Sequence, residues 1–120
     1  MKEVDGKKVL KTVERVSISN LKGDKTEVIL ARVDTGASKS SVGLGLAAKL
    51  ELGPIKGYTN IKNAHGVTTR AVVEAVINID GEKIREKFTI GDRQDMKYKA
   101  LIGRNVLRRG FLVDASEEEE

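Results

Sequence analysis

The stretch that decides the fold is Val33-Asp34-Thr35-Gly36-Ala37. Its first residue, Val33, is the last of a mainly apolar run that begins at Thr26. The run from Thr26 to Val33 suits a strand buried on both faces. Asp34 therefore follows the end of a strand, and Gly36 allows a tight turn there because glycine has no Cβ. Near the other end of the chain, Ala100-Leu101-Ile102-Gly103-Arg104-Asn105 predicts a second apolar strand that ends in glycine. We expect this strand to pack beside the Asp34 turn.

Size and composition limit the classes of protein to consider. The chain has 120 residues, enough for one domain, and it contains no cysteine, which excludes disulfides and thiolate metal sites. No apolar run approaches the ~18 residues that span a bilayer, and the N-terminus lacks the apolar core of a signal peptide. We therefore expect a cytoplasmic protein with no membrane partner. The net charge is +4 although residues 117–120 are all glutamate, so the remainder is more basic still.

The periodicity along the chain is mainly that of strands. Alternating or continuous apolar residues predict strands over 8–19, 26–33, 58–64, 67–79, about 84–90, 99–102 and 111–113. Tight turns are expected at His65-Gly66 and Asp80-Gly81. Short helices are expected over 44–52 and 104–109, each after a glycine turn, with loops over 34–41 and 91–97. The sum predicts a small all-β domain over residues 1–114, with an acidic disordered tail over 115–120.

The Asp-Thr-Gly-Ala loop and the later Leu101-Ile102-Gly103-Arg104-Asn105 segment together resemble the retropepsin-like aspartic proteases. More particularly, residues 33–41 resemble a cytoplasmic bacterial and archaeal branch once labelled ATP-dependent zinc proteases, some of whose members sit beside enzymes that add glutamates to proteins. The resemblance implies a small closed acid-protease barrel with one or two short helices and one lobe per chain. Because there is one Asp-Thr-Gly, it also implies an aspartic endopeptidase built as a homodimer.

The resemblance assigns roles to positions of this chain. Asp34 would be catalytic, paired with its symmetry copy across a two-fold axis. Thr35 would brace the pair, and Gly36 would let the two loops approach closely. A mobile hairpin would cover a peptide or protein substrate, and basic residues around the cleft would favour acidic peptides. The implied substrate-binding residues are Ala37, Ser38, His65, Gly66 and Val67, and the implied structural support comes from Leu101, Ile102, Gly103 and Arg104.

Two features of the sequence set the chain apart from the viral retropepsins: Ser38, and the single glycine, Gly66, at the hairpin tip in place of a glycine-rich turn. Ser38 stands where viral retropepsins carry an acidic residue that pairs with the later arginine, so we interpret Arg104 as a structural ion-pair or dimer-contact residue. Nothing in the sequence accounts for ATP or zinc: no phosphate-binding Gly-x-x-x-x-Gly-Lys loop is present, and a single His without Cys is a poor zinc ligand set. We therefore expect no metal and no other cofactor.

Other readings remain open beside this one. A non-catalytic dimeric peptide-binding module on the same fold would keep the groove but show no turnover. A small basic β-barrel that binds nucleic acid is a third reading, but an aromatic content of 3% provides little for base stacking, so nucleic acid is not an expected partner. A serine nucleophile is not expected at Ser38, Ser40 or Ser41, because the single histidine lies in a different loop and no oxyanion motif is evident.

Overall fold

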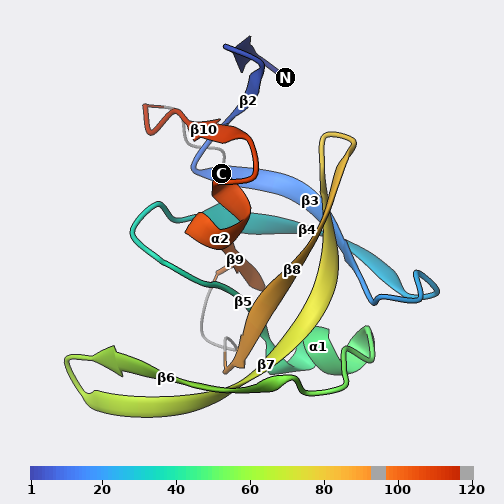
Figure 1. The fold of residues 1–120 in the computed structure, drawn as a ribbon, viewed down its shortest axis with the longest axis vertical. Helices are drawn as coiled ribbons and strands as arrows, with labels where there is room; N and C mark the ends of the chain where they lie inside the picture. The colour runs from blue at the N-terminus through green and yellow to red at the C-terminus, as the bar shows by residue number, and fades with distance from the viewer. Residues whose placement is uncertain (93–96, 117–120) are drawn as a thin grey trace.

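Ten strands and two short helices form the regular structure of this computed structural model, which describes residues 1–92 and 97–116. The predicted all-β fold class is confirmed. Along the chain the elements are β1 (Glu3–Val4), β2 (Lys7–Leu10), β3 (Val13–Ser19), β4 (Thr26–Val33), β5 (Ser40–Gly43), α1 (Leu44–Lys49), β6 (Gly57–Asn63), β7 (Gly66–Ile79), β8 (Glu82–Gly91), β9 (Ala100–Ile102), α2 (Arg104–Leu107) and β10 (Phe111–Val113) (Figure 1).

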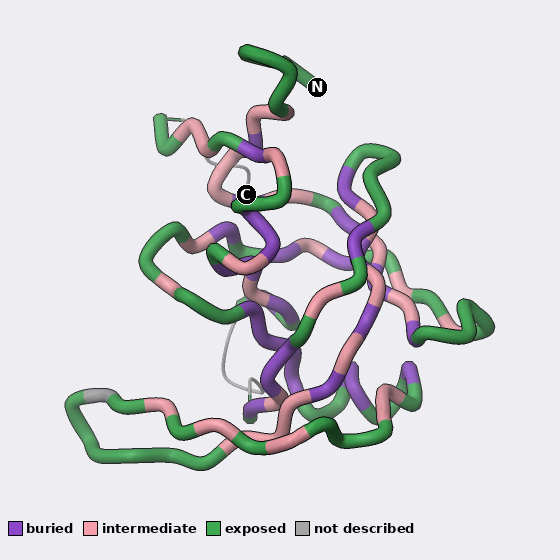
Figure 2. The backbone as a smooth tube through the Cα atoms, in the orientation of Figure 1, coloured by how far each residue is buried: buried purple, intermediate pink, exposed green. Residues whose placement is uncertain are grey.

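Six of the strands close into a barrel that encloses the core. They pair in the order β3-β4-β9-β5-β8-β7, and β3 pairs with β7 to complete the ring. The closing pair is antiparallel, with Ile18 opposite Ile77. Since side chains alternate between the faces of a strand, every second residue of β7 from Val73 onward points inward, and Val73, Ala75 and Ile79 are fully buried with Ile77. Figure 2 shows this half of the strand buried and the outer half exposed.

A separate three-stranded sheet brings the first and last strands together. Its central strand, β2, pairs antiparallel with β1 and parallel with β10. The prediction of one continuous strand over 8–19 is wrong, because β2 belongs to this sheet and β3 to the barrel. At the break, the Lys11 N–H donates to a Glu14 carboxylate oxygen at 2.7 Å, a local bond that accompanies the change of direction. The short strand β1 was not predicted.

β6 and β7 form a long hairpin that extends well beyond the barrel (Figure 1). The two strands pair from Gly57 opposite Val72 out to Asn63 opposite Gly66, whereas β7 pairs with β8 only from Val72 onward. The outer half is therefore a two-stranded ribbon, and residues 64–69 are all exposed (Figure 2). The predicted hairpin with its turn at His65-Gly66 agrees closely with these bounds.

The segment between β4 and β6 differs from its prediction. The expected loop over 34–41 ends early, because Ser40 and Ser41 belong to β5, which lies between β8 and β9. α1 follows directly and is shorter than the expected 44–52. The second helix, α2, is likewise shorter than 104–109, and Gly110 after it adopts a φ of 121°, which favours glycine.

Two sequence predictions fall largely on residues that lie outside the described ranges. The polar loop expected over 91–97 includes 93–96, and the acidic tail expected over 115–120 includes 117–120. The domain boundary at residue 114 therefore stays a prediction.

Candidate active site

Asp34 lies directly after β4, at a point where the backbone is fixed on both sides. β4 and β9 run parallel, with Val33 opposite Ile102. The Asp34 N–H donates to the Ile102 carbonyl oxygen at 2.9 Å, and the Val33 N–H donates to the Thr12 carbonyl oxygen at 2.8 Å. The strand that carries the carboxylate is thus held by its neighbours up to its last residue.

The turn after Asp34 orients the carboxylate. The Gly36 N–H donates to Asp34 Oδ1 at 2.9 Å, and the Ala37 N–H donates to the Asp34 carbonyl oxygen at 3.3 Å. A Cβ at Gly36 would lie 3.2 Å from Asp34 Oδ1, tighter than most contacts of this kind. Asp34 is half-buried, while Thr35 and Gly36 are exposed. The carboxylate is therefore held by the backbone and remains accessible to a ligand.

Arg104 holds the same loop from the other side. Its Nη1 donates to the Thr35 carbonyl oxygen at 2.9 Å, and its backbone N–H donates to the Ala37 carbonyl oxygen at 2.8 Å. The guanidinium thus binds a backbone carbonyl, and the interpretation of Arg104 as a structural ion-pair or dimer-contact residue stays a prediction. An acidic residue at the position of Ser38 is not needed for this contact. The structure thus brings Leu101 to Arg104 against the loop from Asp34 to Ala37.

A buried hydroxyl ties β5 to the glycine turn before α2. Ser40 is fully buried, and its Oγ accepts a hydrogen bond from the Gly103 N–H at 2.9 Å and donates to Asn105 Oδ1 at 2.7 Å. The same Asn105 oxygen accepts from the Ser40 N–H at 3.0 Å, and Asn105 Nδ2 donates to the Lys87 carbonyl oxygen at 2.9 Å. Ser40 was not predicted to belong to the site, because neither the serines nor the Gly-Arg-Asn segment shows by itself that they bond to each other.

Close backbone packing accompanies this network. A Cβ at Gly103 would lie 2.4 Å from the Lys39 carbonyl oxygen and 2.9 Å from the Ala37 carbonyl oxygen. Real Cβ atoms do not approach backbone so closely, so this position requires glycine. The role predicted for Gly103, packing behind the Asp34 loop, fits this geometry.

His65, Gly66 and Val67 lie at the exposed tip of the β6–β7 hairpin. In Figure 1 this hairpin and the loop that follows β4 both project from the left side of the molecule. The positions predicted to bind substrate therefore come from two separate projections of the chain, the hairpin tip and the loop carrying Ala37 and Ser38. Gly66 adopts a φ of 124° at the hairpin turn, where glycine is favoured.

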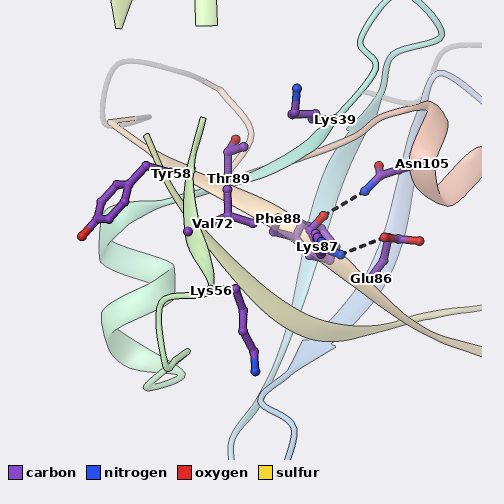
Figure 3. Close-up of a pocket in the computed structure, with 10 residues that line it drawn as sticks. Lys39, Lys56, Tyr58, Val72, Glu86, Lys87, Phe88, Thr89 and Asn105 are labelled. Atoms are coloured by element: carbon purple, nitrogen blue, oxygen red, sulfur yellow. Dashed lines mark hydrogen bonds between the residues drawn. The ribbon is translucent and has the colours of Figure 1, made fainter. Parts of the chain in front are cut away.

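A cavity of about 360 Å³ lies between the base of the hairpin and β8 (Figure 3). It contains three lysines and one glutamate, and Glu86 is engaged by Arg109 at 3.1 Å. The sequence does not indicate this cavity, because its lining residues are scattered along the chain. The lining residues are Lys39, Lys56, Gly57, Tyr58, Val72, Glu86, Lys87, Phe88, Thr89 and Asn105.

Charged residues also connect the strands at the root of the hairpin. Glu74 accepts hydrogen bonds at 3.2 Å from Arg85 Nε and Nη2, and Lys56 Nζ lies 3.7 Å from its carboxylate. The hydrogen bonds from Arg85, assisted by the charges of Arg85 and Lys56, hold the pKa of Glu74 below its usual value. The hydrogen bonds to Glu74, together with its negative charge, in turn raise the pKa of Arg85. These contacts link the residue before β6 with β7 and β8.

Neither a metal cluster nor a membrane helix is evident in residues 1–92 and 97–116. No group of three or more His, Cys, Asp or Glu side chains there could hold a metal ion. Within the same ranges, both helices fall far short of the length and apolar character that a bilayer crossing requires.

Comparison with known families gives a match over more than half of the chain. A family model described as "RimB-like: Retropepsin-like aspartic endopeptidase RimB" matches residues 46–119. The chain belongs to the RimB-like family. The matched segment begins after Asp34, so the loop that bears the carboxylate lies outside it.

A curated relative from Shewanella halifaxensis, named as a probable alpha-L-glutamate ligase, is 30% identical over 114 residues. That alignment covers 74% of this chain and 25% of the relative, so the chain spans about a quarter of the relative's length.

Solved structures share the fold of this RimB-like chain. The EIAV protease in complex with the inhibitor HBY-793 has a TM-score of 0.64 at 17% identity, covering 91% of this chain and 92% of the other. A protein of unknown function from Legionella pneumophila has a TM-score of 0.63 at 18% identity, covering 92% and 95%. A retropepsin-like aspartic protease from Rickettsia conorii has a TM-score of 0.55 at 24% identity, covering 78% and 85%. The predicted retropepsin-like barrel is thereby confirmed.

Proposed function

We propose that this RimB-like chain is an aspartic endopeptidase that works as a homodimer, with Asp34 from each chain forming the catalytic pair. The observation that carries the proposal is the position of Asp34, which follows a strand and is held through Ile102 and Gly36. Membership of a retropepsin-like family supports the same reaction. One chain supplies one such carboxylate, so the second must come from a second copy.

The chemistry requires two carboxylates close enough to share one proton. Like charges at that distance cannot both ionise, so one carboxyl group stays protonated while the other is charged. The charged Asp34 removes a proton from a water molecule, whose oxygen attacks the peptide carbonyl carbon. The protonated Asp34 donates its hydrogen bond to the carbonyl oxygen as negative charge develops there. Proton transfer to the leaving nitrogen then allows the C–N bond to break.

Substrate is proposed to lie as an extended strand between the hairpin and the Asp34 loop. Backbone hydrogen bonds of the β-addition kind would hold it, and side-chain pockets would select it. Ala37, Ser38 and the hairpin tip at 65–67 would provide these contacts. Lys39 and Lys87, at the cavity beside the hairpin, favour acidic side chains. The similarity to a protein named as a glutamate ligase agrees with a glutamate-rich peptide.

The test is cleavage of a glutamate-rich peptide by purified protein with the change Asp34→Asn. We expect the parent to cleave and the variant to lose at least about a thousandfold in kcat, because a neutral amide cannot activate water. Asp5→Asn, which alters a carboxylate in an exposed turn, is the matched control and should retain activity. Cleavage that survives in pure Asp34→Asn protein would remove this residue from the mechanism.

The alternative function is a non-catalytic dimeric peptide-binding module on the same fold. The fold is compatible with it, because the similarity to a Legionella pneumophila protein of unknown function, with a TM-score of 0.63, shows the fold without an activity. Such a module would bind the same peptide, measured by calorimetry, with no product in the cleavage assay and equal affinity for the parent and Asp34→Asn. A cytoplasmic location stays a prediction under both functions.

A further inference from the structure

The β6–β7 hairpin leaves the barrel at a defined point. β8 pairs with β7 as far as Val72, which lies opposite Thr89. Continuing this antiparallel register by two residues places Arg70 opposite Gly91, the last residue of β8. Beyond this point β7 has only β6 as a partner within the described residues. A two-stranded ribbon is only marginally stable by itself, so contacts at its root control how it is held.

Arg70 makes such a contact with Gly91. An added Cβ at Gly91 would lie 2.7 Å from Arg70 Nη1, 3.0 Å from Cζ and 3.4 Å from Nε. The guanidinium therefore lies across the bare Cα of Gly91, in space that any side chain would take. Gly91 itself is buried and pairs with Gly43 of β5, so the surface on which Arg70 rests belongs to the barrel wall.

The chemistry of this contact is unusual for an arginine. Arg70 is half-buried, and within residues 1–92 and 97–116 its side chain has no hydrogen-bond or ion-pair partner. Its neighbours on the same face, Val72 and Thr89, line the cavity at the hairpin base. Packing of a flat group, rather than charge pairing, is what joins the hairpin to the barrel here.

We propose that Arg70 is a positioning residue that sets the angle at which the β6–β7 hairpin leaves the barrel, by lying across Gly91. The expected effect on catalysis rests on the proposed function, in which the hairpin covers the substrate. The expected effect on the orientation of the hairpin does not. With the guanidinium in place, the hairpin holds one orientation relative to the barrel. Without it, the ribbon samples several orientations, and substrate must bind to the fraction of molecules that are correctly arranged.

Electron-spin distance measurements test the orientation directly. The chain has no cysteine, so Thr68→Cys on the hairpin and Lys22→Cys in the β3–β4 turn give two label sites. Labelled protein is diluted with unlabelled protein to suppress distances between copies. We expect one narrow distance in the parent and a broadened or displaced distribution with Arg70→Ala and with Gly91→Ala. Arg70→Lys should resemble Arg70→Ala, because a lysine keeps the charge but lacks the planar group.

Two controls separate this role from general destabilisation. Lys62→Ala removes a cation from the same hairpin and should leave the distance unchanged. Gly91→Ala should displace the Arg70 guanidinium with little change in melting temperature, because the three atoms nearest the added methyl all belong to the end of that flexible side chain. In an Arg70→Ala background, Gly91→Ala should leave the distance distribution as it is in Arg70→Ala alone. A parent-like distance distribution in Arg70→Ala would overturn the proposal, as would a broadened distribution in Lys62→Ala.

Kinetics provide the second measurement. Arg70→Ala should raise KM by about fivefold, the factor expected for loss of a contact of about 1 kcal/mol, with a smaller change in kcat. An equal loss in kcat at unchanged KM would contradict a positioning role. If the parent cleaves no peptide at all, the proposed protease function fails, but the spin-label distances need no activity and still decide the inference about Arg70.

Discussion

Gly36 lies in the Asp34 loop and Gly103 packs against it, and a side chain at each position would meet a different neighbour. At Gly36, a Cβ would lie 3.2 Å from an oxygen of the Asp34 side chain, which can rotate away. At Gly103, it would lie 2.4 Å from the carbonyl oxygen of Lys39, which belongs to the backbone. The Asp34 carboxylate can rotate away from an added methyl, but it then loses its orientation. The Lys39 carbonyl can move only if the two backbone segments separate.

We therefore expect opposite effects from two alanine substitutions. Gly36→Ala should fold with nearly parental stability and lose about tenfold in kcat, because Asp34 is no longer held at its angle. Gly103→Ala should lose roughly 3 kcal/mol or more in the free energy of unfolding, because overpacking falls on rigid backbone. Urea denaturation and peptide cleavage measure the two effects, and a Gly103→Ala protein as stable as the parent would contradict the packing described.

Ser40 provides a second prediction at this scale. Ser40→Ala should lower the free energy of unfolding by about 1–3 kcal/mol, because the buried Gly103 N–H loses its acceptor. Ser38→Ala, in the loop just before β5 and exposed, is the matched control and should change stability by less than about 0.5 kcal/mol. Equal stabilities of the two variants in urea denaturation would show that the Ser40 bonds add nothing.

The residues that the sequence could indicate are those with local signals. Asp34, Gly36 and Gly103 follow or end apolar runs, so their positions at strand ends could be predicted. The Ser40–Asn105 bonds could not, because they depend on β5 lying between β8 and β9, and two serines give no strand signal. The cavity lysines were missed for a similar reason, since only the folded chain brings Lys39 beside Lys87.

At the scale of elements, the root of the hairpin combines the Arg70 contact with the charges around Glu74. Glu74 lies on β7, Arg85 on β8 and Lys56 just before β6, so one carboxylate connects three parts of the chain. Exposed ion pairs contribute little individually, but this one has two hydrogen bonds from a single guanidinium. Its contribution should depend on pH.

Glu74→Gln should lower the urea midpoint at neutral pH, because the amide cannot pair with the two cations. The folded protein lowers the pKa of Glu74 from its ordinary value of 4.5, so the ion pairs stabilise the fold above that pH. The contribution is lost as the pH falls further and the carboxylate is protonated. The difference between parent and variant should therefore shrink on acidification, with exposed Glu3→Gln as control; a constant difference from pH 7 to pH 3 would contradict it.

Elements with a clear period were predicted well, and those set by tertiary pairing were not. β7 could be recognised from its alternation, and its turn from His65-Gly66. The break between β2 and β3 has no glycine or proline to mark it, because the chain simply changes sheets at Lys11 and Thr12. β5 and β1 are too short for any periodicity to show.

At the scale of the molecule, the proposed reaction needs two copies of the chain. A symmetric pair would place both Asp34 side chains at one site, since each copy offers the same surface to the other. Activity should then depend on pairing as well as on the number of intact chains. This dependence distinguishes a shared site from one that is complete within a single chain.

Mixing the parent with an equal amount of inactive chains tests the shared site. An equal mixture of parent and Asp34→Asn chains, allowed to exchange, should retain about a quarter of the activity of the same total concentration of parent, because only parent–parent pairs carry two aspartates. Independent sites would retain about half. Sedimentation of each protein and of the mixture checks that the variant still pairs, and a retained half with full exchange would exclude the shared dyad.

The contact between Gly103 and the Lys39 carbonyl also has an evolutionary consequence. It constrains the path of the main chain from 37 to 39 while leaving the Ser38 and Lys39 side chains turned to the solvent. If those side chains select the peptide, as proposed above, mutation can exchange them, and with them the preferred peptide, without displacing the neighbouring carboxylate. Selectivity and reactivity can drift independently in such a protein, so related chains could acquire new targets while retaining the same chemistry.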